Sequence, residues 1–344
     1  MIDVKPRVSV VVLGYNERSY LENCLAAVLD QDYPRQQYEV IFVDNASNDG
    51  SSELVKERFS EVRIVRTEQN YGFGGGNNRG AAQAKGELVA FLNADTIVHR
   101  GWISGMVQAI DADPLVKACV SGGLAPDLPG FAPIDRQGMP AYVYYGDIVR
   151  FGHVGNNRIR SDASPRPMLH LSGCSAMVDL SILNELEYLF DESYFLDGDD
   201  TDLGFRINSL GYKVVVSPHA LFYHLVKTVP ADLKPTKRAL GRMVKMHRNR
   251  FVTYYRNMYT VEFILALPVL LLGSSLKPFT FEMSLWRKLA YAVAIIPITW
   301  YALLLAAWTC FPKNVVKRQR ILQRRRVEPF WFLQQILVRR HYTQ

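Results

Sequence analysis

Short apolar runs alternate with segments of helical periodicity along the first two thirds of the chain. The apolar runs occupy residues 8–13, 38–43, 62–65 and 88–92, and apolar residues recur at helical spacing within residues 21–29. Continuous apolar runs of this length are typical of strands that are buried on both faces of a parallel sheet. Their alternation with helices predicts an α/β fold, with a doubly wound, mainly parallel, Rossmann-like sheet and flanking helices.

Polar side chains follow three of these predicted strands at the point where each strand ends. Asn16 comes after the first strand, Asp44 after the second and Asp95 after the fourth. Open α/β sheets bind their ligands at the carboxyl ends of their strands. A turn built from Asn and Asp would explain any one of these ends, whereas three such ends together favour a binding site.

A glycine-rich segment at residues 70–80 has four glycines within five positions. Glycine allows close approach of the backbone to a ligand and tolerates positive φ. A helix expected from residue 81 onwards would offer free N–H groups to a diphosphate. The segment is neither a P-loop nor a strand-following dinucleotide fingerprint, and a flexible surface loop is the alternative.

Four carboxylates are crowded ahead of another helical pattern, at Asp197, Asp199, Asp200 and Asp202. Such crowding costs stability unless a metal ion, an arginine or a protonation change relieves it. A helix N-cap needs only one Asp, and the spacing of an EF-hand is absent. The cluster is therefore a second candidate site, with a solvated acidic turn or a Ca²⁺ site as the alternatives.

Taken together, these motifs resemble those of glycosyltransferase family 2, the inverting nucleotide-sugar transferases of the GT-A fold. The resemblance covers roughly residues 7–226 and includes a glycine-rich loop familiar from rhamnosyltransferase-like members. It rests on Gly14-Tyr15-Asn16-Glu17, Val43-Asp44-Asn45, the glycine-rich residues 70–80, Asn93-Ala94-Asp95 and Asp199-Asp200-Thr201-Asp202-Leu203. Each motif alone is weak, whereas their combination is specific.

The resemblance implies that the strand ends and the glycine-rich segment bind a nucleotide-diphosphate sugar. The residues implied are Tyr15, Asn16, Glu17, Asp44, Ser47, Asn70, Gly72, Phe73, Gly74, Asn77, Asn93 and Ala94. Among them, Asp44 matches the aspartate with which the family recognises the nucleobase.

The resemblance also implies a divalent metal ion, Mg²⁺ or Mn²⁺, beside the donor. The first Asp of the family's DXD motif is Asn93 here, so Asp95 is the expected carboxylate ligand, and His224 is expected as a further ligand. One carboxylate with diphosphate oxygens and water suits a hard cation, and neutral imidazole is a plausible additional ligand. Such an ion would neutralise the charge that develops on the leaving diphosphate.

By the family's E-D-x-D-L-x-x-R motif, Asp200 is the expected catalytic base, with Asp199 in place of the usual Glu. Asp200 would take the proton of the acceptor hydroxyl as its oxygen attacks the anomeric carbon. Asp199 and Asp202 would cap the helix, hold the acceptor or orient Arg206. Asp95 would serve the donor and Asp200 the acceptor. Two such carboxylates suit a single displacement with inversion at the anomeric carbon.

The acceptor side is expected in residues 121–168, which are rich in Gly, Pro, Asp and Arg and predict a long loop. The resemblance implies that this loop lines the acceptor and that the extended segment after it places Ser172 and Gly173 beside the sugar or acceptor. An irregular surface loop and simple strand packing are the alternatives.

Charge is divided unevenly along the 344 residues. The 40 Lys and Arg and 33 Asp and Glu give +7 in total, but the acids concentrate in residues 1–226 and the bases in residues 227–344. A basic segment favours nucleic acid or an anionic membrane surface as its partner. Apolar stretches next to the basic residues, and the lack of an RNA-binding motif, favour membrane lipids over nucleic acid.

The apolar stretches lie at residues 263–276 and 289–311. A span needs ~20 residues, so the second is a transmembrane candidate and the first is marginal. Basic flanks on both sides predict a membrane hairpin or two interfacial helices. The expected parts are a catalytic domain (1–226), a basic juxtamembrane helix (227–256), two hydrophobic helices (257–312) and a basic cytoplasmic tail (313–344).

The expected cellular location rests on the N-terminal sequence and on the cysteines. The N-terminus leads into a strand without a signal peptide, and the four cysteines lack metal-ligand spacing, as is typical of small core residues in a reducing compartment. We therefore expect the protein at the cell membrane, with its catalytic domain on the cytoplasmic side.

These expectations combine in an inverting glycosyltransferase of cell-envelope polysaccharide biosynthesis. It would move a hexosyl or deoxyhexosyl group from a nucleotide-diphosphate donor to a hydroxyl of a lipid-linked or polysaccharide acceptor. A polyprenyl-phosphate sugar synthase, whose acceptor phosphate scarcely needs a base, is one alternative. A non-catalytic sugar-nucleotide-binding scaffold is the other.

Overall fold

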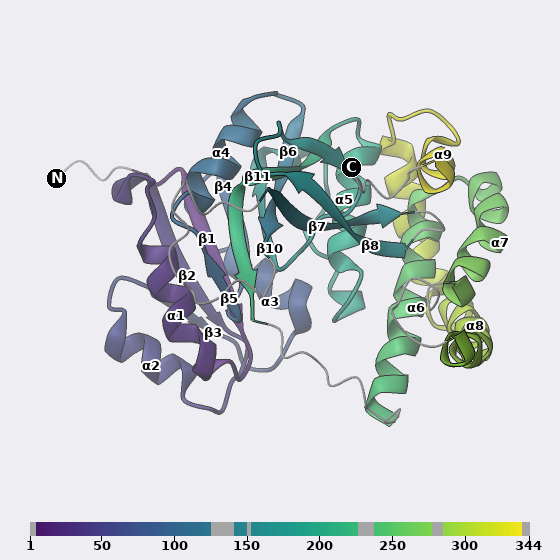
Figure 1. Ribbon diagram of the computed structural model, residues 1–344, viewed down its shortest axis with the longest axis horizontal. Helices are drawn as coiled ribbons and strands as arrows, with labels where there is room; N and C mark the ends of the chain where they lie inside the picture. Colours follow the sequence, from purple (N-terminus) through teal and green to yellow (C-terminus); the bar gives the residue numbers. More distant parts are fainter. Residues whose placement is uncertain (1–4, 125–140, 150–152, 226–236, 277–284, 339–344) are drawn as a thin grey trace.

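The computed structural model describes residues 5–124, 141–149, 153–225, 237–276 and 285–338. Figure 1 shows a twisted sheet with helices on both faces and a group of C-terminal helices packed beside it. The α/β fold predicted from the apolar runs is therefore confirmed.

The first half of the sheet is parallel, as predicted. Its central strand β1 (Val8–Gly14) lies between β2 (Tyr38–Asp44) and β4 (Leu88–Asn93), and β2 also pairs with β3 (Arg63–Arg66). The helices that connect these strands are α1 (Arg18–Leu29), α2 (Ser51–Arg58) and α3 (Gly72–Ala81). Parallel pairing brings the carboxyl ends of β1, β2 and β4 to one edge of the sheet.

The second half of the sheet is mixed, so the prediction of a mainly parallel sheet is wrong beyond β4. The strand β10 (Ser175–Asp179) runs antiparallel between β4 and β6 (Val116–Gly123). The strand β11 (Lys213–His224) is parallel to β6 and antiparallel to the short β5 (Thr96–Val98). Between β6 and β10, the described residues form strands rather than a crossover helix, and parallel neighbours need such a crossover.

Alternate residues of the buried strands enter two separate hydrophobic cores. Val10 and Phe42 pack on one face with Trp102 of α4 (Trp102–Asp111), while Val11 and Ile41 pack on the other face. Both faces are fully covered, which explains why these strands read as continuous apolar runs.

Most of residues 141–149 and 153–168 lie in strands, so the loop predicted there is wrong for the part that the structure describes. The strands β7 (Tyr142–Val149) and β8 (His153–Arg160) make an antiparallel hairpin, and β9 (Arg166–Met168) pairs with β11. The hairpin has period-two burial, with Val143 buried and Tyr144 exposed. Frequent Gly, Asn and Arg residues obscured this alternation. The rest of the predicted loop, residues 125–140, lies outside the described residues.

The C-terminal helices form a third core against α5 (Asp199–Ser209). These helices are α6 (Lys237–Asn257), α7 (Thr260–Leu276), α8 (Leu285–Arg324) and α9 (Trp331–Val338). The rings of Phe205 in α5 and Phe332 in α9 stack with centroids 4.9 Å apart, and Phe251 and Tyr254 of α6 lie in the same core. The helices thus pack on the catalytic domain, and the expected boundary at residue 312 falls inside α8.

The length of these helices bears on the expected membrane segment. Among the described residues, no single helix is both long enough and apolar enough to cross a bilayer. The two parts of α8, Ile295–Trp308 and Lys313–Arg324, meet at a bend of 84°. They have the length and apolar composition of a membrane span only when they are taken together.

The helix α5 lies against the backbone of residues 169–171, and this close approach requires glycine at position 204. A Cβ at Gly204 would stand 2.5 Å from the carbonyl oxygen of Leu169 and 2.8 Å from the nitrogen of Leu171. Because both neighbours are backbone atoms, they have little freedom to move away.

We predict that Gly204→Ala destabilises the protein by about 1–3 kcal/mol, because the added methyl overpacks a rigid contact. The matched control is Gly241→Ala in α6, where nothing lies within 4 Å of the added Cβ. That control should be stabilised by about 0.5–1 kcal/mol, because Ala favours the helix. Urea unfolding measures both, and a Gly204→Ala variant as stable as the wild type would contradict the proposed contact.

Candidate active site

The loops after β1 and β2 are joined by hydrogen bonds between predicted donor-site residues. The N–H of Asn16 donates to Ser47 Oγ at 3.0 Å, and Asn16 Oδ1 accepts from the N–H of Asn48 at 2.9 Å. Asn16 has a φ of 57°, a left-handed conformation that Asn tolerates better than most residues. Tyr15 beside it is exposed, and Glu17 forms the N-cap position of α1.

Asp44 is buried at the end of β2 and organises the loop that follows. Its Oδ1 accepts the N–H of Ser47 at 2.7 Å, and its Oδ2 accepts the hydroxyl of Ser52. The Nε of Arg66 lies 3.8 Å from the same Oδ2. Through these contacts Asp44 fixes the shape of the loop after β2.

The glycine-rich segment forms a helix, so the prediction that a helix begins after it is wrong. The helix α3 begins at Gly72, although glycine is a poor helix former. A Cβ at Gly76 would meet Leu13 at 2.4 Å, and one at Gly80 would meet Val11 at 2.3 Å. Close packing against β1 thus overrides the weak intrinsic propensity.

Asn45 holds the start of this helix, and it was missing from the predicted site residues. Its Nδ2 donates to Asn70 Oδ1 at 3.1 Å and to the carbonyl of Gly72 at 3.0 Å, while its Oδ1 accepts the N–H of Tyr71. Asn70 also accepts the N–H of Gly72 at 2.8 Å. The sequence signal that could have pointed to Asn45 was its position directly after Asp44, at the end of an apolar run.

Asp95 and His224, predicted together as metal ligands, lie side by side. Pairing of β5 with β11 sets His224 opposite Thr96, and the distance from His224 Nε2 to Asp95 Oδ1 is 3.2 Å. Both side chains are partly exposed. Within the described part of the chain, no group of three or more His, Cys, Asp or Glu residues is arranged to hold a metal ion. The pair fits a site in which diphosphate oxygens and water complete the coordination.

Asp200 lies at the start of α5 and is held by two backbone donors. Its Oδ1 accepts the N–H of Thr201 at 2.7 Å, its Oδ2 accepts the N–H of Gly173 at 3.3 Å, and His170 Nε2 lies 4.0 Å from Oδ2. A Cβ at Gly173 would come within 2.5 Å of the Phe73 ring. The structure therefore brings Gly173, Phe73 and Asp200 together and adds His170, which the sequence placed only in an extended segment.

Asp199 is buried beside Asp200 and against α3. Its Oδ2 has no hydrogen-bond partner among the described residues, and a Cβ at Gly74 would stand 2.7 Å from that atom. Burial, and then the negative charge of Asp200, raises the pKa of Asp199 to about 8. Asp199 is thus neutral at pH 7, which relieves the crowding of carboxylates. Asn77, which was predicted to bind the nucleotide-sugar donor, is also buried. Its side-chain amide has no hydrogen-bond partner among the described residues.

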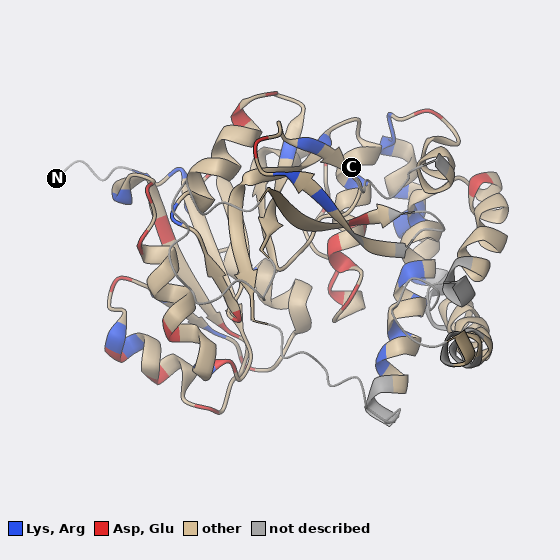
Figure 2. Cartoon of the chain, viewed as in Figure 1, with Lys and Arg blue, Asp and Glu red and all other residues tan. Residues whose placement is uncertain are grey.

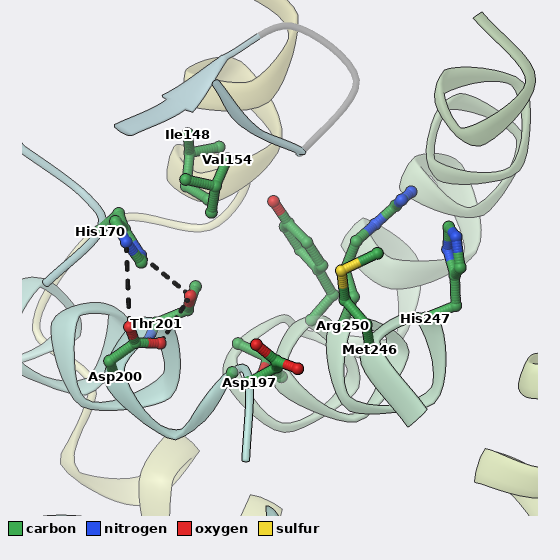
Figure 3. Close-up of a pocket in the computed structure, with 12 residues that line it drawn as sticks. Ile148, Val154, His170, Asp197, Asp200, Thr201, Met246, His247 and Arg250 are labelled. Atoms are coloured by element: carbon green, nitrogen blue, oxygen red, sulfur yellow. Dashed lines mark hydrogen bonds and ion pairs between the residues drawn. The ribbon is translucent and has the colours of Figure 1, made fainter. Parts of the chain in front are cut away.

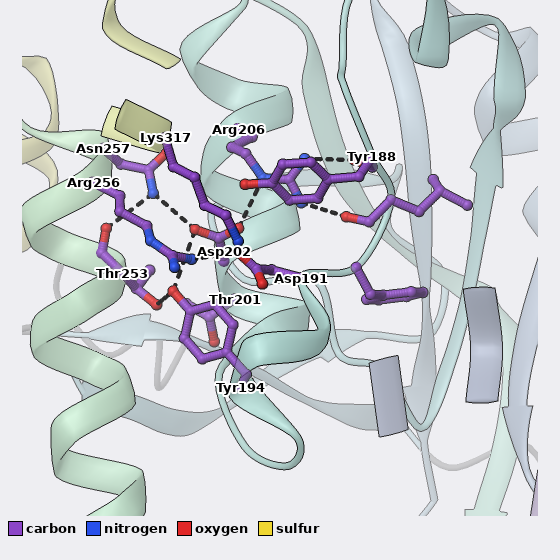
Figure 4. A network of polar contacts seen from close by, with 12 residues as sticks. Tyr188, Asp191, Tyr194, Thr201, Asp202, Arg206, Thr253, Arg256, Asn257 and Lys317 are labelled. Atoms are coloured by element: carbon purple, nitrogen blue, oxygen red, sulfur yellow. Dashed lines mark hydrogen bonds and ion pairs between the residues drawn. The ribbon is translucent and has the colours of Figure 1, made fainter. Parts of the chain in front are cut away.

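Asp202 and Arg206 form a buried ion pair within α5, and their other hydrogen bonds hold the helix against its neighbours (Figure 4). The distance from Arg206 Nε to Asp202 Oδ2 is 2.8 Å, and Arg206 Nη1 donates to the carbonyl of Tyr188 at 2.7 Å. Asn257 of α6 donates to Asp202 Oδ1 at 3.2 Å. Of the predicted roles for Asp202, the geometry supports the orientation of Arg206.

A second buried carboxylate, Asp191, connects the catalytic domain to α6 and α8. Arg256 Nη1 lies 2.8 Å from Asp191 Oδ2, and the Nζ of Lys317 contacts the same oxygen (Figure 4). Burial alone would raise the pKa of Asp191, but the two cations hold it well below its usual range. Basic residues of the C-terminal region thus have partners inside the protein, which the charge asymmetry alone did not predict.

The model of the family described as "Glycosyl transferase family 2" matches residues 9–187. The chain belongs to this family. It is an enzyme of the glycosyltransferase class, as the resemblance implied.

Three relatives are similar to parts of this glycosyltransferase. Glycosyltransferase AglE of Haloferax volcanii is 34% identical over 113 residues, which are 32% of this chain and 37% of the relative. The teichuronic acid biosynthesis glycosyltransferase TuaG of Bacillus subtilis, whose assignment is putative, is 38% identical over 98 residues. These residues are 28% of this chain and 38% of the relative. The N-acetylglucosaminyl-diphospho-decaprenol L-rhamnosyltransferase of Mycobacterium tuberculosis is 29% identical over 245 residues. The match covers 65% of this chain and 76% of the relative. The chain thus spans little more than a third of the first two.

Solved structures share the fold at low sequence identity. A mannosyltransferase from Pyrobaculum calidifontis, in complex with GDP-Man and Mn²⁺, superposes with a TM-score of 0.56 at 20% identity, covering 93% of this chain and 86% of that one. TarS 1–349 of S. aureus gives a TM-score of 0.52 at 17% identity, covering 92% and 88%. These likenesses confirm the GT-A-like α/β fold, with a mixed sheet.

The protonation of Asp199 predicts a specific pH dependence of stability. Its folded-state pKa is raised above the unfolded value, so the folded protein retains a proton that the unfolded chain releases, and Asp199 lowers stability as pH rises from about 4 to about 8. Asp199→Asn should therefore gain stability relative to the wild type across this window, on the order of 1 kcal/mol per pH unit.

Urea unfolding from pH 5 to pH 8.5 measures this difference. Asp197→Asn is the matched control, because Asp197 is a more exposed carboxylate on the same segment and pairs with Arg242. A stability difference between Asp199→Asn and wild type that stays constant with pH would show that Asp199 does not carry the proton.

Proposed function

We propose that this enzyme transfers a sugar from a nucleotide-diphosphate donor to a hydroxyl of a lipid-linked or polysaccharide acceptor, with inversion at the anomeric carbon. The observation that carries the proposal is the position of Asp200. Its carboxylate is fixed by the N–H groups of Thr201 and Gly173 and lines a cavity (Figure 3).

The donor half of the site is supported by the strand ends. Asn16 and Ser47 shape the loops at the carboxyl ends of β1 and β2, and α3 packs beside them. Asp95 and His224 would hold a Mg²⁺ or Mn²⁺ ion there, which when bound would neutralise charge on the departing diphosphate. The Mn²⁺ in the complex of the mannosyltransferase neighbour is consistent with this choice of metal.

The acceptor half is supported by the pair of carboxylates at the start of α5. Asp200 as the general base would accept the proton of the attacking hydroxyl, while burial raises the pKa of Asp199 and favours its protonated form. Two adjacent carboxyl groups whose environments differ in this way can take different roles. A single displacement then inverts the anomeric centre, and no covalent intermediate is required.

The acceptor class is supported by the printed names of relatives. One relative acts on N-acetylglucosaminyl-diphospho-decaprenol, and another, TarS, acts on poly(ribitol-phosphate). Both acceptors carry phosphate, and one is a lipid.

The location at the cytoplasmic side of the cell membrane is supported by apolar side chains on the outside of α7 and α8. Trp286 and Trp308 are 82% and 86% exposed, and Trp300, Ile264 and Leu272 are exposed as well. Exposed apolar side chains of this number are typical of an interaction or membrane surface. Basic residues lie along the neighbouring α6 (Figure 2), where they would meet anionic lipids.

We predict that Asp200→Asn lowers the rate of sugar transfer by roughly 10²–10⁴-fold, because the general base is lost, while donor binding is unchanged. Asp95→Asn should instead abolish the gain in donor affinity that Mn²⁺ produces. Donor screening by thermal shift with and without Mn²⁺, followed by nucleoside-diphosphate release, measures both. Full transfer by Asp200→Asn would favour a phosphate acceptor, as in a polyprenyl-phosphate sugar synthase.

We predict that Trp300→Ser combined with Trp308→Ser weakens binding to vesicles by roughly tenfold or more, because each buried aromatic side chain contributes about 1.5–3 kcal/mol. Flotation with vesicles containing phosphatidylglycerol measures the effect. The control is Leu115→Ser, which removes an exposed apolar side chain between α4 and β6. Equal flotation of all three proteins would rule out α8 as the membrane surface.

A further inference from the structure

A cavity of about 260 Å³ lies between the start of α5, the β7–β8 hairpin and α6 (Figure 3). Asp200 and Thr201 line one side of it, and Ile148 and Val154 of the hairpin line another. The wall formed by α6 contributes Met246, His247, Arg250, Thr253 and Tyr254. The proposed function uses Asp200 but leaves the wall of α6 without a role.

Two groups that can donate hydrogen bonds to an anion lie on this wall. Arg250 and His247 are three residues apart on one helix, so they share a face. One Nη of Arg250 donates to the carbonyl of Leu270 in α7, which fixes the direction of the guanidinium. Burial lowers the pKa of Arg250 to about 10, which still leaves it a cation at pH 7.

Tyr254 is a third polar group on this wall. It is buried, it lines the cavity, and its hydroxyl has no hydrogen-bond partner among the described residues. Burial raises the pKa of this hydroxyl, so it remains a donor at neutral pH. A buried hydroxyl without a partner is destabilising, and a ligand that accepts its hydrogen bond would remove that cost.

The polarity of the surroundings changes in a definite order away from Asp200. The carboxylate of Asp200 comes first, with Asp197, which is paired with Arg242, beside it (Figure 3). The wall of α6 follows, and its Arg250 contacts α7. The outer side of α7 exposes Val261, Ile264 and Leu265. A molecule with a sugar hydroxyl, then a phosphate, then a hydrocarbon chain has its groups in the same order.

We propose that the cavity is the acceptor's phosphate subsite, in which Arg250, His247 and Tyr254 bind the phosphate that links the acceptor sugar to its lipid. This inference rests on the proposed function, because it assumes that the acceptor hydroxyl is placed at Asp200. A guanidinium can bind two phosphate oxygens at once, so Arg250 would select a phosphate-linked sugar over a neutral glycoside.

The test is binding of farnesyl diphosphate to the full chain in neutral detergent micelles, measured by isothermal titration calorimetry, with farnesol as the uncharged probe. Arg250→Gln should weaken farnesyl diphosphate binding by roughly 10- to 100-fold and leave farnesol unchanged. Arg250→Lys should be intermediate. Tyr254→Phe should weaken binding severalfold without loss of thermal stability, because it removes only an unpartnered hydroxyl.

Arg248→Gln is the matched control, since it removes the same charge from α6 outside the cavity, where Arg248 bonds Asn249 and Ser193. Equal affinity for farnesyl diphosphate and farnesol, or equal weakening by Arg248→Gln and Arg250→Gln, overturns the subsite. Competition by phosphatidylglycerol as strong as that by unlabelled farnesyl diphosphate overturns it too, because the surface would then recognise lipid headgroups in general.

Asp200→Asn separates this inference from the proposed function. It should bind farnesyl diphosphate like the wild type, since the binding step needs no base. If Asp200→Asn also transfers sugar at the wild-type rate, the proposed catalysis fails even though the phosphate subsite is intact.

Discussion

The buried carboxylate of Asp191, held between Arg256 and Lys317, joins the sheet domain to the C-terminal helices. Breaking a buried ion pair by removing one partner costs about 3–5 kcal/mol, because a buried charge is left uncompensated. Asp202, with Arg206 and Asn257, repeats the arrangement a short distance along the chain. Through these contacts α5 has a fixed position, and the carboxylate of Asp200 at its start is fixed with it.

The donor side was largely predictable from sequence, and the reason is local. Strand, polar end and helix follow one another within a few residues of Asn16, Asp44 and Asp95, so parallel pairing alone brings these ends together. The contact between Asp95 and His224 spans a long stretch of chain, and it could be expected only because the resemblance implied a histidine after the last strand. Their 3.2 Å separation follows from the pairing of β5 with β11.

The acceptor side was harder to predict, because long-range packing decides it. The β7–β8 hairpin leaves no periodic signal that survives its glycines and arginines. An extended segment was expected at β10, but its antiparallel direction depends on contacts with β4 and β6. The same is true of Tyr254 and Arg250, which read as an ordinary basic helix until α6 is placed beside Asp200. Propensity also misplaced the start of α3, where contact with β1 outweighs the cost of glycine.

That helix has a consequence for communication across the active site. A helix so rich in glycine has little stability of its own, so its order depends on the surfaces that it touches. Its first residue, Gly72, packs against the carbonyl of Phe195, and Gly74 packs against Asp199, while Asn45 ties its start to the donor loop. A change in the order of α3 would therefore reach both the loop after β2 and the carboxylates at the start of α5, so α3 would link the proposed donor side to the proposed acceptor side.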